Sequence, residues 1–213
     1  MYVTGTWGIL KGMYDTHSMP NPEALFALAS EQAGYFTSAQ ARACGYSWTM
    51  LSYHAATGRF IRLRRGLYRL RDYPSSRHEE VMAAWLATGK ETTVVSHESA
   101  LELLDLSDVS PDHVHLIVPR SRRGIVALTG ATLHTVAQVL SPQDTMTWDG
   151  MRLTTPLRSI LDAAEYGTSP EQIVMAITQA VDRGLILPEA LRSRARDYSA
   201  RVARLVTNAL DVG

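Results

Sequence analysis

Apolar residues recur at helical spacing in three short segments near the start of the chain. Asn21 and Pro22 supply a cap and a first-turn proline to the first segment, while Thr37 and Ser47 cap the next two. A glycine follows each segment and is expected to end the helix. Two short helices joined by a four-residue turn are typical of a helix-turn-helix. The predicted helices span residues 22–33, 38–43 and 48–57.

A β-hairpin is predicted directly after these helices. Strand-forming residues alternate with arginines over residues 59–70, on either side of a turn at Arg65-Gly66. Three helices followed by a basic hairpin form a winged helix-turn-helix. The arginines are expected to point outward, and the residues expected to pack inward are Ile61, Leu63, Leu67 and Tyr68.

The chain after Pro74 mixes helical and strand patterns, so the predicted fold class is α+β. We expect a flexible tail over residues 1–20, a winged helix-turn-helix domain over 21–73 and a mixed α/β domain over 75–213 that ends in helices. Predicted helices of the second domain span residues 77–88, 96–104, 156–166, 170–183 and 188–210, and predicted strands span 92–95, 113–118, 128–139, 145–148 and 151–154.

The composition excludes several classes of protein. The chain has 213 residues, of which 46% are hydrophobic and 20% charged, which is typical of a globular protein rather than a disordered one. No apolar run approaches the about 18 residues that cross a bilayer, and the first residues lack the apolar stretch of a signal peptide. The lone cysteine, Cys44, cannot form an internal disulfide, which suits a cytoplasmic protein without a membrane partner.

The net charge of zero hides a strong asymmetry along the chain. Residues 32–71 contain seven arginines and no acidic residue, whereas residues 72–182 contain seven basic and fifteen acidic residues. Such a segment predicts a local positive field, and arginine grips phosphate with two hydrogen bonds. The charge pattern therefore favours nucleic acid as the partner of the hairpin.

These motifs resemble a known family. Tyr35-Phe36-Thr37, Gly58-Arg59-Phe60 and the hairpin segment 65–70 are similar to the N-terminal domain of AbiEi-type antitoxins of type IV toxin–antitoxin systems, and residues 154–162 resemble their second-domain motif. The resemblance covers about residues 20–210. It implies a transcriptional repressor that binds inverted repeats in its own promoter and counteracts a cognate nucleotidyltransferase-like toxin, generally without a stable complex between the two.

One departure from the family concerns the third helix, which holds neither lysine nor arginine. Hydroxyl groups and apolar contacts can still read base edges, with arginines elsewhere supplying phosphate contacts. The candidate DNA-binding residues are Arg42, Ser47, Trp48, Thr49, Ser52, Tyr53, Arg59, Arg62, Arg64, Arg65 and Arg69. A second candidate basic surface comprises Arg120, Arg122 and Arg123, with Arg192, Arg196 and Arg204 on the predicted last helix.

The alternative to a DNA-binding antitoxin is an enzyme that modifies the toxin, with the winged helix as a docking module. Asp162, Asp149 and Lys90 could mimic a phosphotransferase centre, but their spacing does not favour one. His113 and His115 share a strand face, yet no third ligand has the spacing of a metal site, so we expect no metal and no cofactor. The sequence therefore leaves open whether the protein is an enzyme.

Overall fold

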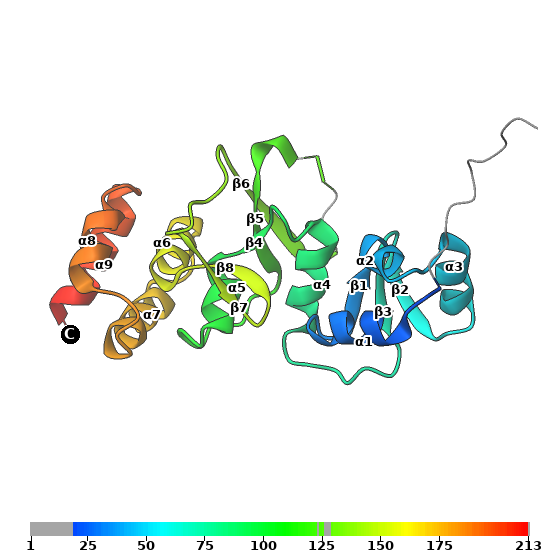
Figure 1. Cartoon of the computed structure of the whole chain (residues 1–213). Coiled ribbons are helices and arrows are strands. Elements are labelled where there is room, and N and C mark those ends of the chain that lie inside the picture. Colours follow the sequence, from blue (N-terminus) through cyan, green and yellow to red (C-terminus); the bar gives the residue numbers. More distant parts are fainter. Residues whose placement is uncertain (1–18, 123, 126–128, 213) are drawn as a thin grey trace, which may run out of the picture.

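The computed structural model describes residues 19–122, 124–125 and 129–212. Its elements form two groups, each built around its own sheet, and the molecule is elongated (Figure 1). The fold class is α+β, as the sequence predicted. The predicted tail lies almost wholly outside the described residues. Among the helices that the structure describes, none combines the length and the apolar content that a bilayer span requires.

The first group holds the predicted helices and hairpin, and its strands run antiparallel in the order β1-β3-β2. The predicted caps are confirmed, since Asn21 Oδ1 accepts a hydrogen bond from the Ala24 amide at 2.9 Å and Ser47 Oγ accepts one from Met50 at 3.2 Å. The elements are α1 (Pro22–Ser30), β1 (Tyr35–Thr37), α2 (Ser38–Ala43), α3 (Trp48–Ala56), β2 (Phe60–Arg64) and β3 (Leu67–Leu70).

Strand β3 is central in this sheet, and both of its faces are covered. Tyr68 packs with Phe36 and Phe60 in a small core under the three helices, where the rings of Phe36 and Phe60 meet edge to face at 5.0 Å. Leu67 and Tyr35 belong instead to the larger core of the second group. The consecutive residues Leu67 and Tyr68 are therefore both buried, as predicted, but on opposite sides of the sheet.

The prediction that Ile61 and Leu63 pack inward is wrong. They are 37% and 36% exposed, because β2 is the edge strand and the helix at Glu79–Thr88, which covers this face of the sheet, packs mainly against β1 and β3. Phe60 at the start of β2 is buried instead. Alternation within the hairpin therefore places an apolar pair on the surface beside the arginines.

The second group carries a five-stranded sheet in the order β6-β5-β4-β8-β7. Strand β5 runs parallel to β6 and antiparallel to β4. Apart from the last predicted helix, the helices of this group were predicted to within about two residues at each end. The elements up to the last strand are α4 (Glu79–Thr88), β4 (Val94–Val95), α5 (His97–Leu103), β5 (Val114–Pro119), the 3₁₀ turn η1 (Arg120–Arg122), β6 (Ala131–Val136), β7 (Thr145–Trp148) and β8 (Met151–Thr154).

Four helices complete the chain: α6 (Pro156–Tyr166), α7 (Pro170–Asp182), α8 (Pro188–Ala195) and α9 (Ala200–Val212). The prediction of one long final helix is wrong. The chain breaks between α8 and α9, where the Ser199 amide and hydroxyl both donate to Glu165 of α6, at 3.2 and 2.7 Å. A hydrogen bond from Tyr198 to Asp162 holds the same segment against α6. These tertiary contacts replace the helical continuation.

Helix α4 lies between the two sheets and packs against both (Figure 1). Its residues Val81, Ala84 and Trp85 are buried in the larger core. At the far ends of the molecule, α3 lies at the blue and cyan side and α8 and α9 at the orange and red side (Figure 1). The fold thus separates the arginine-rich hairpin from the final helices.

Candidate nucleic-acid interface and histidine cluster

Helix α3 presents an uncharged outer face. Leu51 is fully buried, while Trp48 and Tyr53 are 55% and 63% exposed. Thr49 and Ser52 are also exposed, and the N-cap residue Ser47 is half-buried. The surface of α3 therefore offers hydroxyl groups and two aromatic rings, which can make hydrogen bonds and apolar contacts but no ion pair.

Positive charge reaches this face from neighbouring elements. The guanidinium of Arg42, near the end of α2, lies 5.4 Å from the centre of the Trp48 ring. A cation over an aromatic face is attracted to the ring quadrupole, so this contact orders both side chains at the start of α3. Arg42 is itself exposed.

A groove runs between the start of α3 and the hairpin. It brings together two candidates from the helix, Trp48 and Ser52, with two from the hairpin, Arg62 and Arg65. Both arginines are exposed. The full lining is Ser38, Trp48, Ser52, Arg62, Arg65, Gly66 and Tyr68.

Exposed arginines around this groove lack acidic partners among the described residues. Arg42, Arg59, Arg62 and Arg65 form no ion pair with any carboxylate that the structure describes. Arg71, at the base of the hairpin, donates a hydrogen bond to the Gly58 carbonyl. The exposed arginines of residues 32–71, which include no acidic residue, therefore form one basic surface. Arg64 contributes a half-buried side chain to it.

Arg69 does not belong to this surface, and the prediction that it points outward is wrong. It is 9% exposed and forms an ion pair with Glu79 of α4 at 3.1 Å. Because β3 is central, alternation turns Arg69 toward α4, together with Tyr35, whose ring lies 5.6 Å from the guanidinium. Arg69 has a structural role at the junction of the two groups.

The arginines of the second candidate basic surface do not form one surface. Arg122 donates to the Thr92 hydroxyl and the Thr88 carbonyl, both at 3.1 Å, and Arg192 pairs with Asp211 at 2.8 Å. Arg204 donates to a carbonyl of its own helix, whereas Arg120 and Arg196 are exposed. Arg123 lies outside the described residues. The α8 and α9 residues lie at the opposite end of the molecule from α3 and do not extend the hairpin surface (Figure 1).

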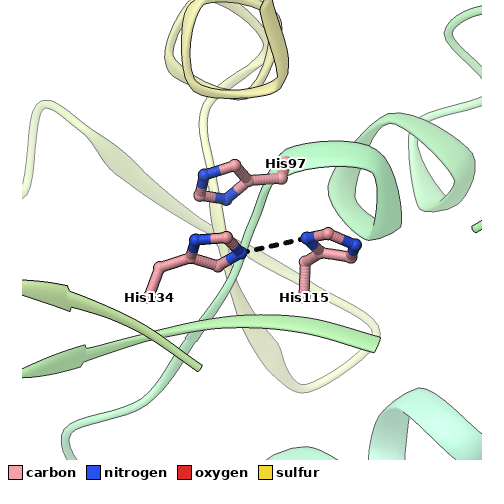
Figure 2. Close-up of side chains that lie close together, drawn as sticks. All are labelled: His97, His115 and His134. Atoms are coloured by element: carbon pink, nitrogen blue, oxygen red, sulfur yellow. Dashed lines mark hydrogen bonds between the residues drawn. The ribbon is translucent and has the colours of Figure 1, made fainter. Parts of the chain in front are cut away.

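Sequence reasoning missed a cluster of three histidines in the second group. Figure 2 shows His97, His115 and His134 with their rings side by side, and each offers a ring nitrogen within 4.8 Å of the others. His115 Nδ1 and His134 Nε2 lie 3.0 Å apart, and the rings of His97 and His134 stack at 3.7 Å. The expectation that His115 has no nearby third ligand is therefore wrong, while His113 is exposed and outside the cluster.

The parallel pairing of β5 and β6 creates this cluster. Ile117 of β5 is in register with His134, so His115, two residues earlier, projects from the same face of the sheet. His97 begins α5 with a positive φ of 52° and turns its ring over the other two. No periodic pattern in the sequence signals a contact between strands that are joined by a long connection.

Burial keeps the cluster uncharged. Desolvation, with the other two histidines adding to it, lowers the pKa of His97 to about 2. Desolvation and His115 lower the pKa of His134 to about 4, and burial also lowers the pKa of His115. All three imidazoles are therefore neutral near pH 7 and keep one lone pair each.

The two aspartates considered for a phosphotransferase centre lie beyond opposite ends of β8. Asp162 is buried in α6, where Arg158 donates to both of its carboxylate oxygens, at 2.9 and 2.7 Å, and Tyr198 donates at 2.8 Å. Asp149 is exposed in the turn before β8, whereas Asp162 follows the other end of that strand. The carboxylate of Asp162 is thus occupied by internal partners.

Comparisons with known proteins were made for the sequence and the fold. A search of curated proteins gave no match. The RV2827C protein from Mycobacterium tuberculosis, known from a crystal structure, is similar in fold, with a TM-score of 0.60 over 88% of this chain and 74% of that chain, at 14% identity. A family model described as transcriptional regulator, AbiEi antitoxin, matches residues 23–71 and supports an antitoxin role. The resemblance to AbiEi-type antitoxins is thereby confirmed over the segment that carries the three helices and the hairpin.

Proposed function

We propose that this protein is a DNA-binding antitoxin of a type IV toxin–antitoxin system that represses its own operon in the cytoplasm. In this proposal residues 21–73 are a winged helix-turn-helix domain, and residues 75–213 are the domain that counteracts a nucleotidyltransferase-like toxin. The match of residues 23–71 to the antitoxin regulator family supports the first part and an antitoxin role in general. The DNA partner is the double-stranded promoter, with inverted repeats as its operator.

The observation that carries the proposal is the groove between α3 and the hairpin. Arg62 and Arg65 line it without a described acidic partner, opposite Trp48 and Ser52. In this arrangement the hairpin arginines bind backbone phosphates, while the exposed hydroxyls of α3 face base edges in the major groove. Phosphate contacts fix the position of the helix, and the hydroxyl contacts supply sequence preference.

Arg42 extends the phosphate-binding surface beyond Trp48, which lines the groove. It lies near the end of α2, and its contact with Trp48 limits its motion. An ordered guanidinium loses less conformational entropy on binding than a mobile one. We propose that Arg42 contacts the phosphate backbone beside the groove that receives α3.

The distribution of charge supports a division of labour between the two domains. Residues 72–182 carry an excess of acidic side chains, which DNA repels. Helices α8 and α9 lie at the opposite end of the molecule from α3 (Figure 1). A protein bound to its promoter through α3 would leave these helices free for antitoxicity.

The test is a titration of a labelled promoter fragment with the full chain at several salt concentrations, read by fluorescence anisotropy. The double variant Arg62→Ala, Arg65→Ala is expected to bind at least about tenfold more weakly. Loss of two phosphate contacts also reduces the slope of log affinity against log salt concentration by about two.

Arg196→Ala is the matched control, because Arg196 is also exposed but directly follows α8, which lies at the far end of the molecule (Figure 1). It removes one positive charge, as each substitution of the hairpin variant does, and is expected to leave both affinity and salt slope unchanged. An unchanged slope in the hairpin variant, or an equal loss in the control, contradicts the placement of DNA against the hairpin.

A further inference from the structure

The histidine cluster has the features of a metal-ion site. His97, His115 and His134 come from the start of α5 and from strands β5 and β6, and each directs a ring nitrogen to within 4.8 Å of the others (Figure 2). The proposed DNA interface uses none of them.

In two of the three rings the nitrogen that points away from the cluster faces a polar side chain. His97 Nδ1 lies 2.8 Å from the Ser96 hydroxyl, which leaves Nε2 as its free nitrogen. His115 Nε2 lies 3.8 Å from a carboxylate oxygen of Glu98, whose other oxygen accepts a hydrogen bond from Thr168 at 2.7 Å. A carboxylate behind a histidine fixes the tautomer and raises the basicity of the opposite nitrogen. In His115 that opposite nitrogen is Nδ1, which faces His134.

We propose that His97, His115 and His134 together bind one Zn²⁺ ion, with Glu98 as the outer carboxylate that orients His115. Three imidazoles suit Zn²⁺ among the common biological cations, because Mg²⁺ and Ca²⁺ require oxygen ligands. The fourth tetrahedral position is open to water or to an external ligand.

The three ring nitrogens must converge slightly when the ion binds. Two nitrogens on a tetrahedral Zn²⁺ lie about 3.3 Å apart. His115 Nδ1 and His134 Nε2 are already at 3.0 Å, whereas the ring of His97 is stacked on that of His134 rather than directed at the same point. Binding therefore turns the His97 ring out of its stack, while the other two ligands move little.

Solvent can reach the site on one side. His134 is only partly buried. Tyr166, whose ring meets all three imidazoles edge to face, is 55% exposed. Tyr166 therefore forms one wall of the site at the surface. An ion can enter beside it without unfolding of the core.

Metal binding should also stabilise the fold, because it joins the edge strand β6 to β5 and α5. An ion that binds only the folded state shifts unfolding in proportion to the logarithm of its concentration over Kd. This effect is local to the second group and leaves DNA affinity unchanged. The metal site and the DNA interface are thus tested by different measurements.

The experiment is a Zn²⁺ titration of untagged full-length protein after EDTA treatment and its removal, in competition with a chromophoric chelator. We expect one ion per chain with a Kd in the micromolar range or tighter. His134→Ala is expected to weaken binding by at least about 100-fold, and Glu98→Gln, which keeps the three ligands, by about 10- to 100-fold. His113→Ala is the matched control, since His113 is an exposed neighbour of His115, and it is expected to bind as the unmodified chain does.

A second measurement needs no variant. Co²⁺ added to the unmodified chain is expected to give the intense visible absorption of four-coordinate Co²⁺, and Zn²⁺ is expected to abolish it. Failure to bind Zn²⁺ in the micromolar range, absence of this spectrum, or a loss in His113→Ala equal to that in His134→Ala overturns the proposal. The three histidines would then form a neutral hydrogen-bonded stack with a structural role alone.

Discussion

The guanidinium of Arg69 donates a hydrogen bond to the carboxylate of Glu79 at 3.1 Å, and this pair joins β3 to α4. The same nitrogen also donates to the backbone carbonyls of Tyr73 and Pro74, at 2.9 and 3.2 Å. Arginine keeps its charge at all relevant pH values, so Glu79 is the group that neutralises this buried cation. This ion pair therefore adds a polar link to the apolar contacts of α4 at the junction of the two sheets.

Glu79→Ala is expected to lower the free energy of unfolding by about 1–3 kcal/mol, because it leaves Arg69 buried with neutral acceptors only. The value lies below that of a fully buried pair, since the Glu79 side chain is 28% exposed. Urea unfolding followed by circular dichroism measures the loss. Glu80→Ala removes the same charge from the next, exposed position and is expected to cost less than about 0.5 kcal/mol. Equal losses in the two variants would contradict a specific role for the pair.

The sequence predicted the features that local chemistry determines. Caps at Asn21 and Ser47 and the turn at Arg65-Gly66 depend on neighbouring residues alone, and the structure has each where it was expected. Strand β1 was missed because three residues carry no periodicity, and its pairing with β3 involves a distant segment.

Features that depend on packing between distant segments could not be predicted in the same way. The burial of Arg69 follows from α4 on the second face of the sheet, and the break after α8 follows from contacts with α6. The histidine cluster depends on the parallel register of β5 and β6, which brings His134 beside His115. Only His113 and His115 are close together along the chain, so residue spacing alone does not indicate the cluster.

Sequence preference is expected to reside in the hydroxyl groups of α3. The double variant Thr49→Ala, Ser52→Ala is predicted to reduce the ratio of operator affinity to random-DNA affinity by about 30-fold or more, because each of the two lost base contacts costs about 1 kcal/mol or more. Binding to random DNA should change little, since the arginines around the groove supply that affinity. Competition of operator and random duplexes for the protein measures the ratio.

Thr147→Ala provides the control for this experiment, because Thr147 is an exposed hydroxyl on β7, away from α3. Its substitution should leave both affinities unchanged. A parallel loss of operator and random-DNA binding in the α3 variant would show that the helix positions the protein without reading sequence.

Substitutions at Asp162 and at its partner Tyr198 are expected to lower the free energy of unfolding by different amounts. Asp162→Asn removes the negative charge that faces Arg158 and places an amide where both oxygens accept hydrogen bonds, so we expect a loss of about 2–4 kcal/mol. Tyr198→Phe removes one hydrogen bond to the same carboxylate and is expected to cost about 1 kcal/mol. Thermal or urea unfolding of both variants measures the order. A larger loss in Tyr198→Phe than in Asp162→Asn would contradict the carboxylate as the centre of this network.

Acid should destabilise the protein through the histidine cluster when no metal is present. Burial lowers the pKa of His97 to about 2 and that of His134 to about 4, whereas both groups titrate near 6.5 in the unfolded chain. Between pH 6.5 and 4 the unfolded state therefore binds protons that the folded state does not. Stability then rises with pH across this interval and is constant, with respect to these groups, above 6.5.

The expected slope is about 1.4 kcal/mol per pH unit for each histidine, measured by urea unfolding in EDTA at pH values from 7 down to 4.5. The variant His134→Gln lacks one of the two titrating histidines. The slope of its unfolding free energy against pH should therefore be smaller by about 1.4 kcal/mol per pH unit, although the variant is less stable than the unmodified chain at pH 7. His113→Gln removes an exposed histidine of the same strand region and should keep the full slope. Identical slopes for His134→Gln and the unmodified chain would mean that the cluster opens and takes up protons before the protein unfolds, contrary to this account.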